Sequence, residues 1–206
     1  MNLFLDQVTF RGNLDLEVKE EMRLSIAAQA CLLVVNSPDW YHTLRNVLVY
    51  PAAFSTGRGR HDGIVVHEWN SGLAGESWSR GPIVLSWDHA LQGGLDADDG
   101  HNVVIHEFAH QLDNLTGHTN GIPLLRKGQR YADWEKAMLD AYRAHVERVE
   151  AGHRTLIDAY GAMNHQEFFA EATVTFFEKP RALRREEPAL YAQLAALYAL
   201  DPAEWN

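Results

Sequence analysis

The stretch VVIHEFAHQLD, from Val103 to Asp113, constrains the fold more than any other part of this 206-residue chain. It places His106 and His110 four residues apart among apolar side chains. Residues at positions i and i+4 of an α-helix lie on the same face, one turn apart. Imidazoles within an apolar helix are costly to bury unless each finds a polar partner. The fold must therefore supply a partner for both rings.

The same stretch has the spacing of a zinc site. His106 and His110 can bind one zinc ion together, and Glu107 stands where it can take a proton from a water molecule that zinc acidifies. Two core histidines satisfied by ordinary hydrogen bonds are the alternative. The apolar surroundings favour the metal, because one ion gives both rings the partner they need. We predict one zinc ion per chain.

A catalytic zinc site also needs a third protein ligand and an open fourth position. Thr116 stands where a short metzincin motif would place a third histidine, so the ligand is expected on a later helix. The segment NHQEFFAEATVTFF offers Glu167, which we rank first, although it can instead form a capping box with Asn164. Glu171 can replace it as ligand or orient a histidine from the second layer. Asp113 is expected to orient a histidine or to lie at the surface.

The remaining pattern places strands first and helices after. A helix is expected over residues 14–35, and polar loops, including residues 55–63, separate three β-rich runs at 46–51, 63–69 and 81–87. Helices are then expected within residues 98–117, 131–152, 164–180 and 188–200. This order indicates an α+β fold with a small mixed sheet, in a single domain over residues 1–206.

Composition argues against several kinds of partner. The chain has 18 Lys and Arg against 28 Asp and Glu, a net charge of −10, which disfavours nucleic acids and anionic membranes. Its one cysteine, Cys31, allows no intrachain disulfide, which fits a reducing compartment. The first residues, MNLFLDQVTF, lack the basic region and apolar core of a signal peptide. A cytoplasmic location is therefore expected.

Four segments resemble the Mlc titration factor A family of zinc peptidases: HEFAHQLD, GESWSRGPIVLSW, YGAMNHQEFFAEATVTFFEKP and LYALDP. The resemblance implies a zincin-like fold, with an active-site helix followed by a helical C-terminal half. It also implies a gluzincin-type site, in which His106, His110 and Glu167 bind zinc and Glu107 is the general base. Family members often extend further upstream than this chain.

The family's catalytic core is similar to that of the lethal-factor metalloproteases, in which a tyrosine precedes the glutamate ligand by seven residues. Tyr160 has that position here, and its hydroxyl could donate a hydrogen bond to an oxyanion. A tyrosine that only packs in its turn is the alternative. By the same analogy, Gly81 to Trp87 is a candidate edge strand for an extended peptide. Its apolar run equally fits a plain buried strand.

Three hypotheses about function follow. The first is an aminopeptidase-like zinc metallopeptidase that acts on short peptides or exposed N-termini. The second, implied by the resemblance, is a regulatory protein that sequesters a glucose-responsive transcriptional repressor, with the zinc site secondary. The intact Glu107 favours the first hypothesis. A purely structural zinc site is the least expected, because Glu107 stands where a base is needed and no fourth protein ligand is evident.

Overall fold

The structure is a computed structural model that describes residues 1–53, 64–69, 72–78 and 81–205. The expected polar loop at residues 55–63 lies outside these ranges. The chain divides into two compact units: Met1–Asp96 with Asn102–Gln111, and Ala97–His101 with Leu112–Asn206. It therefore passes between the units three times, at 96/97, 101/102 and 111/112. The single-domain organisation stays a prediction.

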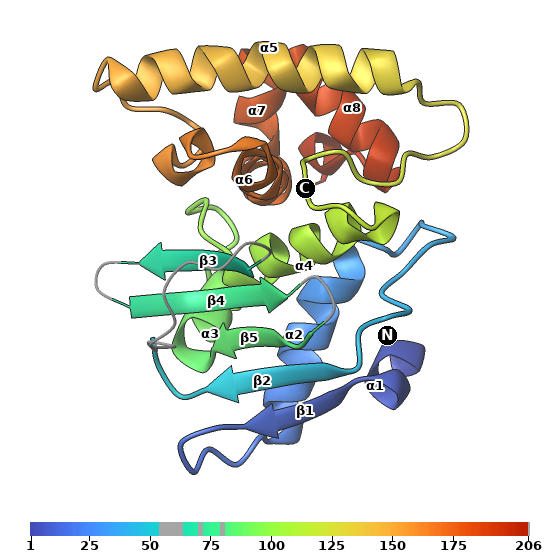
Figure 1. Cartoon of the computed structure of the whole chain (residues 1–206), viewed down its shortest axis with the longest axis vertical. Helices are drawn as coiled ribbons and strands as arrows, with labels where there is room; N and C mark the ends of the chain where they lie inside the picture. The colour runs from blue at the N-terminus through green and yellow to red at the C-terminus, as the bar shows by residue number, and fades with distance from the viewer. Residues whose placement is uncertain (54–63, 70–71, 79–80, 206) are drawn as a thin grey trace. The chain divides into compact units, whose positions relative to one another are not determined.

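A five-stranded sheet forms the framework of the first unit (Figure 1). Its strand order is β1-β2-β5-β4-β3. The strands β1, β2 and β5 are parallel, whereas β4 is antiparallel to both β5 and β3. The sheet is therefore small and mixed, as the sequence predicts. The strand bounds are Thr9–Gly12 for β1, Asn46–Tyr50 for β2, Ile64–Trp69 for β3, Gly72–Trp78 for β4 and Ile83–Ser86 for β5.

The position of β5 corrects one prediction. The segment Gly81 to Trp87 was a candidate edge strand, but β5 pairs with β2 on one side and with β4 on the other. All four of its residues are buried. The alternative of a buried strand is therefore confirmed, and the edge-strand interpretation is wrong. Within the described sheet, the outer strands are β1 and β3.

The helices of the first unit are α1 (Asn2–Gln7), α2 (Glu20–Leu32), α3 (Trp87–Leu95) and most of α4 (Val103–Asp113). Figure 1 shows α2 crossing one face of the sheet, and α2 contacts α3. A cluster of buried aromatic rings holds α4 in this unit. The Phe108 ring lies 5.7 Å from Phe4 and 4.9 Å from Tyr41, measured between ring centroids. Such aromatic contacts add to the free energy of burial.

The start of α4 differs from the expected one. The acidic residues Asp98 and Asp99 precede the helix rather than begin it, and the first turn contains no acidic residue. The helix begins after Asn102, whose side-chain oxygen accepts the Ile105 N–H at 2.9 Å. The Asn102 amide also donates to the carbonyl of Gly93 at 2.9 Å. A buried asparagine therefore caps this helix and ties it to α3.

Helices make up most of the second unit, in which α5 lies across α6, α7 and α8 (Figure 1). The predicted helix at 131–150 coincides with α5. Pro180, read in the sequence as a stop, is the first residue of α7, a position that proline tolerates. Among the described residues, no helix combines the length and apolar character needed to cross a membrane. The helix bounds are Tyr131–Glu150 for α5, His165–Glu178 for α6, Pro180–Glu186 for α7 and Pro188–Tyr198 for α8, with short 3-10 turns η1 (Asn114–Thr116), η2 (Ala159–Ala162) and η3 (Pro202–Glu204).

Candidate metal centre

The two predicted histidine ligands lie one turn apart on α4 and are both buried. Their Nε2 atoms are 3.1 Å apart, and the rings stand nearly perpendicular, at 77°. Two nitrogens bound at about 2.0–2.1 Å to one tetrahedral zinc ion would be roughly 3.3 Å apart. The observed separation therefore suits two ligands of a single ion.

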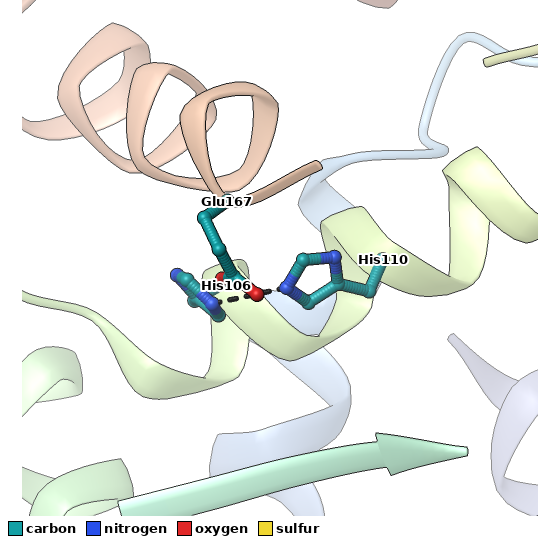
Figure 2. A group of neighbouring side chains, drawn as sticks. All are labelled: His106, His110 and Glu167. Carbon is teal, nitrogen blue, oxygen red and sulfur yellow. Dashed lines mark hydrogen bonds between the residues drawn. The ribbon is translucent and has the colours of Figure 1, made fainter. Parts of the chain in front are cut away.

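Glu167 supplies a third donor. It lies in the first turn of α6, where its backbone N–H donates to the side-chain oxygen of Asn164 at 2.9 Å. This is one of the two hydrogen bonds of the capping box that the sequence offers as the alternative role of Glu167. The carboxylate of Glu167 forms a group with His106 and His110, in which all ligand atoms lie within 4.8 Å of one another. Figure 2 shows the three side chains pointing toward one another.

The chemistry of this donor set fits a divalent metal ion. Two imidazole nitrogens and one carboxylate oxygen are the protein ligands of many catalytic zinc sites, which leave one position open. All three side chains are buried, and a metal ion offers such a group a charge-balancing partner. His106, His110 and Glu167 therefore form a candidate metal site.

Glu107, the predicted base, is fully buried beside β4. Gly75 of β4 faces it so closely that a Cβ at position 75 would stand 2.5 Å from Glu107 Oε1. The same atom would lie 2.7 Å from a methyl group of Val103. Only glycine leaves space for the carboxylate here. Sequence reasoning missed Gly75 because it did not predict β4; a glycine inside a recognised strand often marks close approach of another group.

Tyr160 lies in η2, and its side chain is half-buried. The turn is capped by Asp158, whose Oδ1 accepts the Tyr160 N–H at 2.8 Å. It packs against α6, the helix that carries Glu167. The structure therefore places Tyr160 on a defined turn, while its catalytic role stays a prediction.

The carboxylate of Asp113 turns toward the loop that follows α4. Its Oδ2 accepts the Gly121 N–H at 2.7 Å, and the residue is fully buried, so the surface alternative is wrong. Glu171 is also buried and lies beside Gly161, since a Cβ added at Gly161 would be 3.4 Å from the Glu171 Cβ. Neither carboxylate belongs to the three-residue group found among the described residues. Their proposed part in orienting histidines stays a prediction.

Comparison with known proteins gives one family and several relatives. The model of a family described as glucose-regulated metallo-peptidase M90 matches residues 1–199. An uncharacterized protein of Synechocystis sp. is 42% identical over 205 residues, which cover 98% of this chain and 74% of that protein. The Mlc titration factor A of Yersinia pestis is 35% identical over 168 residues, which cover 79% of this chain and 61% of the factor. The matched part is therefore less than two thirds of the factor's length.

Proposed function

Because this chain belongs to the glucose-regulated metallo-peptidase M90 family, we propose that it is a zinc-dependent peptidase. The observation that carries the proposal is the convergence of His106, His110 and Glu167 within 4.8 Å. The residue types match a catalytic rather than a structural zinc site, since three protein ligands leave a position for water. The proposal includes the zincin-like fold and gluzincin-type ligand set that the sequence resemblance implies.

In this proposal the protein side chains divide the work of hydrolysis. A bound zinc ion would act as a Lewis acid toward water and the peptide carbonyl. Glu107 accepts one proton from the attacking water, whose oxygen forms a bond to the carbonyl carbon. The C–N bond then breaks, and the proton held by Glu107 passes to the departing amine nitrogen. Tyr160 donates a hydrogen bond to the carbonyl oxygen while that atom is negatively charged.

The outer strand β3 is the place we propose for an extended substrate. A peptide adds to a sheet through main-chain hydrogen bonds, which requires a strand with one open edge. β3 pairs with β4, the strand whose Gly75 lies against Glu107. Of the two outer strands β1 and β3, only β3 is therefore paired with β4, the strand that lies beside Glu107. We propose short peptides or exposed N-termini as the substrates, in an aminopeptidase-like reaction.

Substitution of Glu107 by glutamine tests the peptidase proposal. Glu107→Gln keeps the size of the side chain but removes the proton acceptor, so we expect zinc content and folding to be preserved. Hydrolysis of a peptide panel should fall by at least about 10²-fold, the low end for general acid–base catalysis. Metal content is measured by elemental analysis, and His106→Ala serves as the variant that loses zinc.

Wild-type rates in Glu107→Gln would refute this assignment of the site. The second role, sequestration of a transcriptional repressor, is a separate proposal and is not favoured by the geometry. If Glu107→Gln lost hydrolysis but still bound such a partner, the binding role would not depend on proteolysis.

A further inference from the structure

Helix α5 holds both ends of the turn that carries Tyr160. The Tyr142 hydroxyl donates to the carbonyl of Ala162 at 3.2 Å, at the end of η2. The His145 Nε2 lies 3.1 Å from the carbonyl of Asp158, which begins the turn. A carbonyl oxygen only accepts hydrogen bonds, so Nε2 must carry the hydrogen. Tyr142 and His145 are three residues apart and therefore lie on one face of α5.

The same two side chains pack against the first turn of α6. The Tyr142 ring centroid lies 4.3 Å from that of His165 and 5.5 Å from that of Phe168. The His145 ring lies 5.5 Å from Phe168. His165 and Phe168 flank Glu167 in the sequence, so one face of α5 touches both the Tyr160 turn and the turn of the third ligand.

His145 lies close to Gly161 of the turn and to Glu171 of α6. A Cβ added at Gly161 would lie 3.4 Å from His145 Nε2 and 3.4 Å from the Glu171 Cβ. Burial lowers the pKa of His145, although its hydrogen bond to the Asp158 carbonyl and the charge of Asp158 oppose this shift. The lowered pKa favours the neutral imidazole, which donates from Nε2.

We propose that Tyr142 and His145 are positioning residues, which hold the Tyr160 turn in register with the Glu167 turn. The effect on catalysis rests on the proposed function, in which Tyr160 stabilises the oxyanion. Neither side chain is assigned contact with the substrate. Hydrogen bonds from a rigid helix help to fix the geometry of a short turn, in addition to the turn's own bonds.

A double-mutant cycle tests the proposal. Tyr142→Phe and His145→Phe each leave an aromatic ring in place but remove the donor, and together they should lower kcat about tenfold, with KM and zinc content unchanged. In a Tyr160→Phe background the same pair should cause no further loss, because it acts through Tyr160. His145→Gln, which keeps an N–H donor, should recover most of the rate. Tyr131→Phe, at the exposed start of α5, is the matched control and should leave the rate unchanged.

Hydrogen exchange provides a readout that does not need activity. The amides of Tyr160, Gly161 and Met163 are bonded within the turn, and they should exchange about tenfold faster in the paired variant. Unchanged exchange rates in the paired variant would overturn the proposal. So would an equal loss of kcat from the pair in the wild-type and in the Tyr160→Phe background. A wild-type protein without metal-dependent hydrolysis would instead refute the proposed function, and exchange alone would then decide the positioning role. If His145→Phe did not fold, Tyr142→Phe alone would carry both measurements, because its lost hydrogen bond to Ala162 leaves His145 intact.

Discussion

A hydrogen atom is the only side chain that fits at position 75 of β4. The neighbouring atoms belong to Glu107 and to Val103, which comes one turn earlier on α4. Glycine inside a strand normally weakens it, because it packs no side chain and loses more conformational entropy on folding. Gly75 therefore lowers the local stability of β4 but leaves space for the side chain of the proposed base, Glu107.

We expect Gly75→Ala to lower hydrolysis by about 10- to 100-fold, since a displacement of roughly 1 Å in a reacting group costs on this order. The added methyl group must push Glu107 away, whereas the histidine ligands need not move. Zinc content should therefore stay the same. Gly94→Ala is the matched control, because its Cβ would meet the flexible end of Gln29 at 3.0 Å and the Ser25 hydroxyl at 3.4 Å, and no atom of the site. An unchanged rate in Gly75→Ala would show that this contact does not position Glu107.

At the scale of elements, the carboxylate of Asp113 closes the end of α4. It accepts the Gly121 N–H, and Gly121 accepts in turn from the Trp134 indole of α5 at 3.1 Å. Gly121 has φ of +79°, and a Cβ there would lie 2.6 Å from the carbonyl of His165. In the loop after α4, Gly121 thus contacts both the end of α4 and the start of α6.

This buried carboxylate makes stability depend on pH. Burial raises the pKa of Asp113 to about 7, although backbone N–H groups of Gly121, Ile122 and Asn120 oppose the shift. Its pKa in the unfolded chain is about 3.9. Between these values the folded state holds a proton that the unfolded state releases, so this group's contribution to stability falls as pH rises toward 7.

Asp113→Asn should remove this dependence. Between pH 5 and 7.5, metal-free wild type should lose roughly 2 kcal/mol more unfolding free energy than the variant, from the two pKa values. Denaturant unfolding at the two pH values, with chelator present, provides the measurement. Parallel losses in the two proteins would mean that Asp113 is already ionised at pH 5.

The long helices were more predictable than the strands because their signals are local, whereas the short helices α1, α3 and α7 were missed. Asn164 was expected to cap α6 and does so, and Gly152 follows α5 with a φ of +72°. Two strands were missed: β1 is short and largely exposed, and β4 contains two glycines and no apolar alternation. The central position of β5 could not be predicted, since strand order depends on pairing between distant segments.

Some residues of the candidate site could also be predicted from local sequence, and others could not. The spacing of His106 and His110 alone predicts two ligands on one helix face. No local pattern could choose between Glu167 and Glu171, because both lie on one face of α6 and both are buried. The contact between Gly75 and Glu107 joins segments that are separated in the sequence. The hydrogen bonds from α5 to the turn of Tyr160 do the same. Such tertiary contacts leave only weak traces in a single sequence.

For the whole molecule, loss of the proposed zinc should lower thermal stability. A ligand at about 100 times its Kd stabilises the folded state by about 2.7 kcal/mol, which for a protein of this size corresponds to roughly 5–10 °C in Tm. Chelator should therefore lower the Tm of wild type by this amount and leave that of His106→Ala unchanged. An equal effect of chelator on both proteins would mean that the stabilising ion binds elsewhere.

The short segment Ala97–His101 belongs to the second unit, although the chain on either side of it belongs to the first. It is attached there by the Gly100 N–H, which donates to Glu178 at 2.9 Å, and by Lys179, which donates to the Asp99 carbonyl. Consequently no single break in the gene separates the two units: a fragment ending at residue 111 keeps this segment but lacks Glu178. Recombination at one point cannot exchange one unit for another.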